Sequence, residues 1–296
     1  MSVEAFLSYL SLEKNYSPHT VKAYNNDISD FKIFCLENYD VSNIDTVSYS
    51  LVRSWIVNLV NDSISNRTIN RKIASLKAYY KFLQRIEKIA VNPLAKHKAL
   101  KTSKKLEVPF SEVEMLAVLN QISFEEGFEG SRDKLMIELL YTTGIRRAEL
   151  INLKLSDVDL SGLTIKVLGK RNKERIVPLL NTTKELFSQY LAQRNGLEVV
   201  VDEVHAFLSK SGHKIYETLV YRVINKYLGE VSHKAKKSPH ILRHTFATHL
   251  LNKGADLNSV KELLGHSSLA STQVYTHNSI AELKKVHLAS HPRSKK

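Results

Sequence analysis

Two helix starts in the second half of the sequence carry basic and titratable side chains. Arg146 lies in the first turn of a predicted helix, where a cation is unfavourable beside the positive end of the helix dipole unless an anion lies between them. Ser238 and Pro239 are typical of a helix start, and His240 and Arg243 follow them three residues apart. A titratable ring, a fork-shaped cation and free backbone N–H groups together indicate a phosphate site.

Three further side chains could complete such a site. Lys170 lies in a turn between two short β-type runs, so its amine could reach a phosphate oxygen or protonate a leaving group from a hairpin tip. His266 directly follows Gly265, which ends a helical pattern, in a break where a ring can point into a cleft. Tyr275 follows nine residues later. Each of these side chains taken alone is commonly an ordinary surface or half-buried residue.

A metal site is the alternative interpretation of the histidines His240, His244 and His249. No glutamate in an HExxH arrangement accompanies them, and Cys35 is the only cysteine, so a cysteine-cluster zinc site and an internal disulfide are both excluded. We therefore expect no metal and no cofactor. Cys35 is interpreted as a small buried residue of a protein in a reducing compartment.

These motifs occur together and in order, and as a set they resemble the active-site motifs of the tyrosine recombinases, within them the Xer subgroup that resolves chromosome dimers. The motifs are Gly-Ile-Arg146-Arg-Ala-Glu149-Leu, Gly-Lys170, His240-Ile-Leu-Arg243-His244, Leu-Gly-His266 and Tyr275. The resemblance covers nearly the whole chain. It implies a two-domain, C-shaped DNA clamp, with an all-α core-binding domain, a basic linker and a catalytic domain.

The resemblance also implies roles for the motif residues. Arg146 and Arg243 would clamp the scissile phosphate, and Tyr275 would attack it to give a 3′-phosphotyrosyl intermediate. His240 would be the acid–base histidine and His266 the second phosphate donor. Guanidinium and imidazole groups can offset the phosphate charge where other enzymes use Mg²⁺, and the phosphotyrosine bond keeps the energy for rejoining. We therefore expect strand transfer that needs neither metal nor ATP.

Lys170 would be the acid that protonates the leaving hydroxyl, and Glu149 would orient the site. Two departures from the family pattern matter. Arg147 doubles the arginine of the first motif, and Arg146 is chosen because it directly follows Gly-Ile and lies three residues before Glu149. Arg171 replaces a glycine that is common in the turn, so Lys173 remains a rival to Lys170.

The composition indicates a polyanionic partner. The 296 residues carry a net charge of +13 with a pI near 9.5, and 43% hydrophobic and 25% charged residues exclude wholesale disorder. No apolar run is long enough for a transmembrane helix, and the N-terminus does not fit a signal peptide. We therefore expect a cytoplasmic, nucleoid-associated protein that binds double-stranded DNA rather than a membrane.

The charge divides the chain. Residues 1–66 carry four bases and eight acids, whereas residues 67–105 carry twelve bases and one acid. We predict an all-α DNA-binding domain at 1–88, a basic linker at 89–107 and the catalytic domain at 108–296. The predicted helix from Arg67 to Ala90 has an apolar stripe with most bases off it. The bases expected to contact the DNA backbone are Arg67, Arg71, Lys77, Lys81, Arg85, Lys101 and Lys104.

Apolar periodicity predicts a mainly α-helical chain with a small β-sheet in the second domain. The predicted helices span 2–12, 20–36, 50–61, 111–121, 131–142, 146–153, 183–194, 216–230, 239–253 and 258–264, and the predicted strands span 163–168 and 175–179. After Tyr275, the residues Ile280, Leu283, Val286 and Leu288 form an apolar stripe. By resemblance this tail would dock on a neighbouring protomer, and the alternative is packing on its own domain.

The resemblance further implies partners: a homo- or hetero-tetramer on two DNA sites, a paralogous recombinase and a septal DNA translocase. Three other functions remain open from the sequence. One is an integrase of a mobile element with the same chemistry, one is a catalytically silent DNA-binding relative, and one is a metal-dependent hydrolase.

Overall fold

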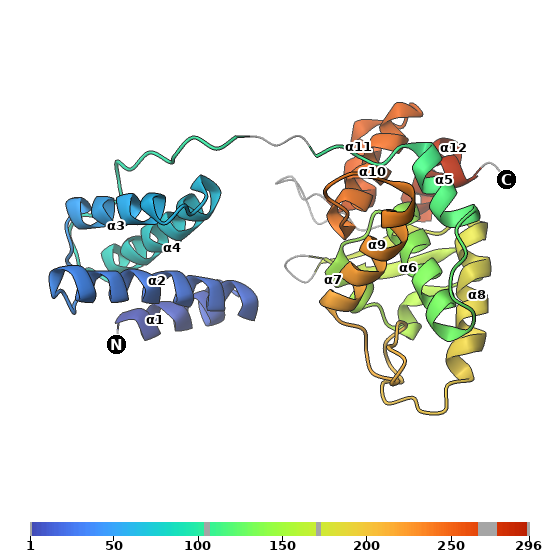
Figure 1. The fold of residues 1–296 in the computed structure, drawn as a ribbon, viewed down its shortest axis with the longest axis horizontal. Coiled ribbons are helices and arrows are strands. Elements are labelled where there is room, and N and C mark those ends of the chain that lie inside the picture. The colour runs from blue at the N-terminus through green and yellow to red at the C-terminus, as the bar shows by residue number, and fades with distance from the viewer. Residues whose placement is uncertain (1, 104–106, 170–172, 266–276, 295–296) are drawn as a thin grey trace. The chain divides into compact units, whose positions relative to one another are not determined.

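The computed structural model describes residues 2–103, 107–169, 173–265 and 277–294. The chain forms two compact units, Met1–Lys105 and Leu106–Lys296 (Figure 1). Their boundary falls within the segment predicted as a linker. Lys104, one of the predicted DNA-contacting bases, lies outside the described residues. No described helix is long and apolar enough to cross a membrane.

The described part of the first unit is all α-helical. Its elements are α1 (Ser2–Ser8), the π-helical turn η1 (Tyr9–Glu13), α2 (Pro18–Tyr39), α3 (Tyr49–Asn61) and α4 (Asn66–Arg85). Serine side chains cap two of these helices, since Ser17 accepts from the backbone N–H of Thr20 and Ser65 accepts from that of Thr68. The apolar faces enclose one core around Trp55, which is almost fully buried.

The predicted basic helix is shorter than expected, because α4 ends at Arg85 and not at Ala90. Glu87 has a left-handed backbone (φ 58°), and the N–H of Lys88 returns to the carbonyl of Leu83. The following chain then folds back onto α4. The side chain of Asn70 bonds both the N–H and the carbonyl of Leu100, each at 2.9 Å, so the first part of the basic segment belongs to the first unit.

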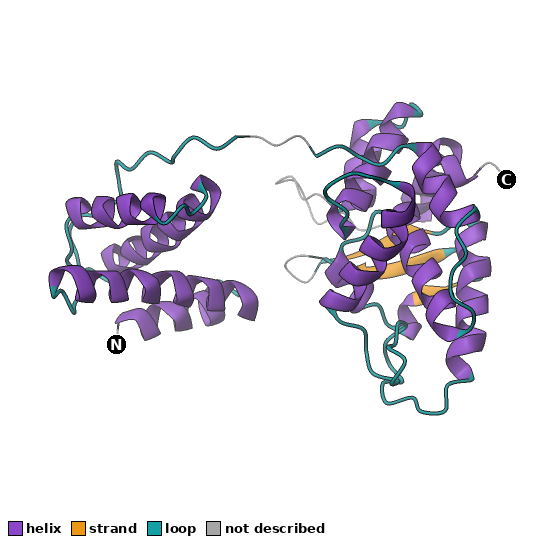
Figure 2. Ribbon diagram, viewed as in Figure 1, coloured by secondary structure: helices purple, strands orange, loops and turns teal. Residues whose placement is uncertain are grey.

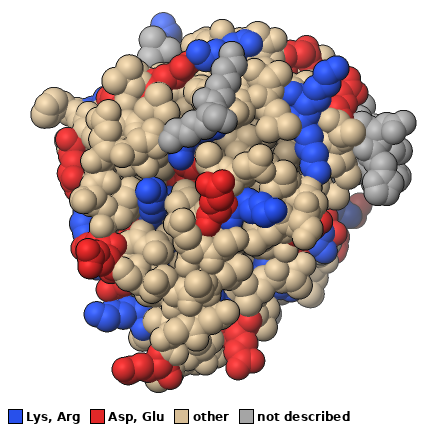
Figure 3. Space-filling view, turned by 90° about the vertical axis from the view of Figure 1, so that its right-hand side faces the viewer, with Lys and Arg blue, Asp and Glu red and all other residues tan. Residues whose placement is uncertain are grey.

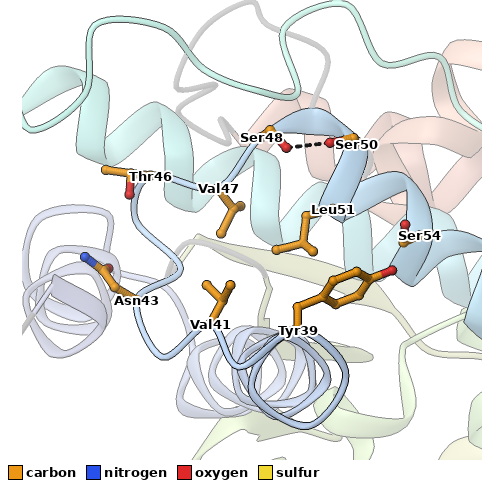
Figure 4. A pocket seen from close by; sticks show the side chains of 9 residues that line it. All are labelled: Tyr39, Val41, Asn43, Thr46, Val47, Ser48, Ser50, Leu51 and Ser54. Carbon is orange, nitrogen blue, oxygen red and sulfur yellow. Dashed lines mark hydrogen bonds between the residues drawn. The ribbon is translucent and has the colours of Figure 1, made fainter.

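A hollow of about 540 Å³ lies between the end of α2 and the start of α3 (Figure 4). Tyr39, Val41, Val47 and Leu51 point toward it, and Ser48 and Ser50 are hydrogen-bonded at its rim (2.6 Å). Its lining residues carry no charge. This hollow therefore has no means of balancing a phosphate.

The second unit is helical around one small sheet (Figure 2). Its elements are α5 (Glu112–Asn120), α6 (Phe128–Thr143), α7 (Arg147–Ile151), the 3-10 turn η2 (Leu155–Asp157), β1 (Val158–Asp159), β2 (Thr164–Leu168), β3 (Glu174–Pro178), α8 (Asn181–Asn195), α9 (Glu217–Val231), α10 (Pro239–Asn252), α11 (Leu257–Leu264), α12 (His277–Ser290) and the 3-10 turn η4 (Pro292–Ser294). The sheet is antiparallel in the order β1-β2-β3, with Leu168 opposite Glu174 at the hairpin end. Strand β1 was not predicted.

Helix α6 is the centre of this unit and is buried along most of its length. Helices α8 and α10 pack against it, and α10 joins α11 and α12 through a second apolar cluster around Phe246. On the face shown in Figure 3, acidic and basic side chains are interspersed. The surplus of positive charge therefore does not form one continuous patch on that face.

The tail packs on its own unit, one of the two alternatives that the sequence left open. Leu283 is buried in the cluster around Phe246, whereas Leu288 stays exposed. Nε2 of His287 lies 2.6 Å from the carbonyl oxygen of Thr142 at the end of α6, and Arg293 pairs with the buried Glu138 (2.9 Å). These polar contacts hold α12 in place, and the apolar pattern of the sequence did not reveal them.

Candidate active site

Arg146 lies where α6 gives way to α7. Gly144 ends α6 with a left-handed backbone (φ 61°), and a Cβ there would come within 2.4 Å of the Phe246 ring. Arg146 is the N-cap of α7, one residue before the first turn in which it was predicted. Its backbone N–H donates to Oε2 of Glu149 (2.7 Å), and its Nη1 donates to Oε1 (2.7 Å). The carboxylate is thus the anion that makes a cation tolerable at this helix start.

Arg243 is buried in α10 and joins two helix ends. Its Nη1 donates to the carbonyl of Gly144 and its Nη2 to the carbonyl of Leu264, each at 2.6 Å. Helix C-termini favour cations, so these carbonyls stabilise the guanidinium. Burial, and then the nearby charge of Arg146, lower the pKa of Arg243 to about 10, so it stays protonated at neutral pH.

Arg175 is a third guanidinium at the same place, and the sequence analysis missed it. Its Nη1 and Nη2 donate to the two carboxylate oxygens of Glu149 (2.7 and 2.8 Å). Burial by itself opposes ionisation of Glu149, but hydrogen bonds and charge from Arg175, and then from Arg146, hold the pKa of that carboxyl below its ordinary value. A signal existed in the alternation of β3, because Arg175 shares the buried face with Val177.

We call Arg146, Arg175, Arg243 and Glu149 the arginine cluster. Arg146 and Arg175 share the carboxylate of Glu149, and Arg243 lies close enough to feel the charges of all three. With three cations and one anion, the cluster keeps two positive charges that a bound anion can balance. Arg146 is the most open member, with 28% of its side chain exposed, against 5% for Arg175. Its Nη2 also lies 3.3 Å from the carbonyl oxygen of Gly265, next to the Leu264 carbonyl that Arg243 holds. The cluster is thus suited to bind a phosphodiester.

His240 lies apart from these contacts. It shares α10 with Arg243, yet its side chain is 75% exposed and its Nε2 is 3.6 Å from Oε2 of Glu107. Lys236 also bonds Glu107, and this hydrogen bond is the main reason that the pKa of the carboxyl is lowered. The structure therefore places the histidine in a surface group of charges at the start of α10, without a hydrogen bond to the arginine cluster.

The hairpin between β2 and β3 is closed by the N–H of Gly169, which donates to the carbonyl of Lys173 (2.7 Å). The Lys173 side chain is exposed. Four residues singled out in the sequence analysis, Lys170, Arg171, His266 and Tyr275, lie outside the described residues. Their described neighbours are Gly169, Gly265 and the start of α12, and the first two lie against Arg175.

The described residues contain no group of three or more His, Cys, Asp or Glu side chains that could hold a metal ion. His249 has a structural explanation, since its Nδ1 meets the Tyr141 hydroxyl (2.9 Å) and its Nε2 lies 2.9 Å from the Phe110 carbonyl oxygen. Both of its ring nitrogens are thereby occupied within the core.

The predicted backbone-contacting bases of α4 all lie on its surface. Arg67, Lys77 and Lys81 are exposed. Arg71 pairs with the buried Asp27, and Arg85 approaches Glu13 (3.8 Å). Lys101, beyond α4, is exposed as well, and its carbonyl accepts from the side chain of Asn66. The structure thus brings these bases to the surface, and two of them have acidic neighbours.

Residues 114–282 match the family model of the phage integrase family, and residues 3–87 match that of the phage integrase N-terminal SAM-like domain. The chain is 40% identical over 302 residues to the tyrosine recombinase XerC of Anoxybacillus flavithermus, covering 99% of this chain and 98% of that protein. It is 39% identical to XerC of Staphylococcus haemolyticus, covering 98% and 97%.

A solved structure of the XerH site-specific recombinase bound to a palindromic difH substrate shares the fold, with a TM-score of 0.71, 21% identity, and coverage of 96% of this chain and 93% of that one. The predicted mainly α-helical fold with a small sheet is confirmed, and so is the predicted family resemblance. The chain belongs to the phage integrase family, within its Xer-type tyrosine recombinases.

Proposed function

We propose that this protein cleaves and rejoins DNA strands at a specific site through a 3′-phosphotyrosyl intermediate formed by Tyr275, and that it resolves chromosome dimers at cell division. The observation that carries the proposal is the arginine cluster, in which Arg146 and Arg175 share the single carboxylate of Glu149 and Arg243 is fixed nearby by two backbone carbonyls. Such a surplus of fixed, charged donors is what a phosphodiester needs when it gains charge in the transition state.

Arg146 and Arg243 bind the non-bridging oxygens of the scissile phosphate. Each retains N–H groups beyond those that bond to the protein. The Gly265 carbonyl holds Arg146, and the carbonyls of Gly144 and Leu264 hold Arg243. Because these donors are fixed before the substrate arrives, they need little reorganisation as charge develops. Each is expected to contribute about 10²–10³ in rate.

In the proposed reaction the Tyr275 phenol oxygen attacks phosphorus and gives its proton to His240. The new bond joins this oxygen to phosphorus, and the bond from phosphorus to the 5′ oxygen breaks. Lys170, or its rival Lys173, protonates the leaving 5′ oxygen, and His266 adds a further donor to the phosphate. A 5′ hydroxyl of the partner strand reverses the sequence and rejoins the DNA.

This scheme supplies the positive charge from the protein's own side chains, and the phosphotyrosine bond preserves the energy of the phosphodiester. We therefore propose that strand transfer proceeds without a metal ion and without ATP, so cleavage persists in EDTA.

We propose double-stranded DNA as the partner, bound by four protomers on two sites, in the cytoplasm at the nucleoid. The relatives named XerC and the XerH structure bound to a difH substrate support DNA as the partner. The exposed bases of α4 are suited to backbone phosphates, which fix position without reading sequence. A paralogous recombinase and a septal DNA translocase would be further partners.

The test is covalent trapping on a nicked suicide substrate that carries the target site. The wild-type protein is expected to accumulate a DNA adduct that survives denaturing gels. Tyr275→Phe is expected to bind the same DNA with unchanged affinity and to form no adduct, because the nucleophilic oxygen is gone while the DNA contacts remain. Tyr221→Phe, which alters an exposed tyrosine of α9, is the matched control and is expected to cleave.

A covalent adduct in Tyr275→Phe contradicts the assignment of the nucleophile. Mapping the wild-type adduct along the host chromosome then separates two biological roles. A single site in the terminus region supports dimer resolution, and attachment at the ends of a mobile element contradicts it.

A further inference from the structure

Arg175 has contacts that distinguish it from the other two arginines of the cluster. Its three kinds of nitrogen are all engaged: Nη1 and Nη2 on Glu149, and Nε on the carbonyl of Leu263 (3.2 Å). Only 5% of its side chain is exposed. Arg146 and Arg243 instead show contacts from their two Nη atoms alone. Arg175 is therefore the least available of the three for a phosphate oxygen.

The same guanidinium joins three separate segments of the second unit. Arg175 itself follows the hairpin that carries Lys170, in β3. Glu149 belongs to α7 and is shared with Arg146. Leu263 lies near the end of α11, three residues before His266. Each segment supplies one residue of the proposed active site. By bonding to all three segments, Arg175 fixes the distances between them.

Two glycines, Gly265 and Gly169, lie close against the Arg175 side chain. A Cβ on Gly265 would lie 3.0 Å from its Cδ and 3.1 Å from its Nε and Nη1. Gly265 also has a left-handed backbone (φ 64°), so a side chain there is unfavourable on both counts. A Cβ on Gly169 would lie 3.5 Å from Nη1 of Arg175. The two glycines let the hairpin and the end of α11 close on the guanidinium from two directions.

We propose that Arg175 is a positioning residue of the recombination reaction: it takes both oxygens of Glu149 so that this carboxylate orients Arg146 without neutralising it, and it fixes the hairpin and the end of α11 at the spacing the phosphate needs. The inference rests on the proposed function of the arginine cluster. Without Arg175, Glu149 would face Arg146 alone, and the pair would present no net charge to the phosphate. The cluster would then hold one surplus positive charge and not two.

Arg175→Lys separates this role from simple charge balance. Lysine keeps the positive charge but is a single point donor, so it cannot hold two carboxylate oxygens and a carbonyl at once. We expect single-turnover cleavage of the suicide substrate at saturating DNA to slow about 10- to 100-fold, the usual effect of losing a residue that orients a catalytic group. DNA affinity is expected to stay within about twofold, since Arg175 is buried and its N–H groups are bonded within the protein.

Arg194→Lys is the matched control for loss of a buried arginine. Arg194 is equally buried in α8 of the same unit, and its Nη2 donates to the carbonyls of Asp202 and His205. Both lysine variants are expected to show similar losses of melting temperature, and Arg194→Lys to cleave at the wild-type rate. Equal slowing in both variants would contradict the proposal, because it would trace the effect to stability.

A substrate with a neutral scissile group distinguishes this role from a purely structural one. A structural defect would slow cleavage of the charged and the neutral substrate equally. Replacing one non-bridging oxygen of the scissile phosphate by a methyl group removes its negative charge, so the reaction depends less on how far Glu149 neutralises Arg146. The rate deficit of Arg175→Lys is expected to shrink at least several-fold on this methylphosphonate. An equal deficit on both substrates would overturn the charge argument.

Glu149→Gln tests whether the two residues act as one unit. If Arg175 works through Glu149, the double variant Arg175→Lys/Glu149→Gln is expected to cleave no more slowly than the slower single variant. Multiplicative losses would contradict the proposal. Failure of the proposed function looks different, because then the wild-type protein itself forms no Tyr275-dependent adduct. Wild-type cleavage with an unimpaired Arg175→Lys leaves that function intact and removes only this inference.

Discussion

The arginines of the two units are held in different ways. On α4 of the first unit, the side chains of Arg71 and Arg85 are 51% and 61% exposed, and their charged partners are carboxylates on neighbouring helices. In the second unit, Arg243 and Arg175 are buried and bound to backbone carbonyls at or near helix ends, and Arg175 is also bound to Glu149. In the first arrangement an exposed side chain can reorient to contact a phosphate of the DNA backbone. The second arrangement fixes a guanidinium in one place.

This difference corresponds to two tasks, binding the DNA backbone and stabilising the transition state of cleavage. Contacts to backbone phosphates hold a protein on the duplex and tolerate small displacements. Stabilising a transition state requires donors whose positions are fixed before the reaction begins, and this is worth several kcal/mol. The comparison therefore predicts that substitutions in the two units separate binding from chemistry.

The largest effect is expected for Arg243→Ala. Removing this guanidinium takes away one fixed phosphate donor and leaves the carbonyls of Gly144 and Leu264 without their partner. Single-turnover cleavage at saturating DNA is expected to fall about 10²–10³-fold, with a much smaller change in DNA affinity. Arg194→Ala controls for the loss of a buried guanidinium. Comparable losses of cleavage and affinity would erase the distinction between the units.

A second contrast lies in the buried titratable groups. In the second unit His287 is fully buried, and this burial lowers its pKa to about 4. In the first unit burial opposes ionisation of Asp45, but hydrogen bonds from Lys88, Tyr79 and Ser2 hold its pKa below the ordinary value. Both groups make stability depend on pH, but in different ranges.

The sign of each effect follows from which state binds the proton. Between pH 6.5 and about 4 the unfolded chain protonates His287 and the folded chain does not, so the unfolding free energy falls as the pH falls, by up to about 1.4 kcal/mol per unit. Asp45 stabilises the first unit at pH values above about 4, and this stability is lost at lower pH. The second unit should therefore lose stability first on acidification.

Trp55, the single tryptophan, lies in the first unit, so its fluorescence reports that unit, while circular dichroism reports both. Urea unfolding between pH 7 and 5 is expected to shift the circular dichroism transition of the second unit more than the Trp55 transition. His287→Gln keeps an N–H donor for the Thr142 carbonyl and removes one titration, so it should reduce this slope; burial also lowers the pKa values of His291 and His249, and these two account for the remainder. An unchanged slope in that variant would show that other groups are responsible.

Features that depend on residues close in the sequence, such as helix starts, could be predicted. Ser17, Ser65 and Ser238 each accept a backbone N–H at a helix start, as such residues do in most proteins, so those helix starts were predicted to within a few residues. Arg146 and Arg243 were found because they lie at or near helix starts. Strand β1 was missed because its two residues are too few to show alternation.

What the sequence did not predict depends on contacts between distant residues. Arg175 hydrogen-bonds to Glu149, which is 26 residues away in the sequence, and to Leu263, which is 88 residues away. Only folding brings these residues together. The sequence could not decide where the tail packs, because its anchors, His287 and Arg293, bind α6 through polar groups that an apolar pattern does not reveal. The exposure of His240 also differs from that of Arg243, although their spacing placed both on one face.

The smallest effect is expected for Lys77→Ala, which tests the other side of the comparison. Lys77 is exposed on α4 and is predicted to contact a backbone phosphate. Its loss should reduce the slope of log affinity against log salt by about 0.9, because one counterion fewer is released on binding. Cleavage at saturating DNA should be unchanged, since the arginine cluster is intact.

Lys32→Ala, on α2 where acids outnumber bases, is the matched control and should leave the slope of log affinity against log salt unaltered. A slower cleavage step in Lys77→Ala at saturation would mean that the first unit takes part in the chemistry, and the separation between flexible and fixed cations would then fail.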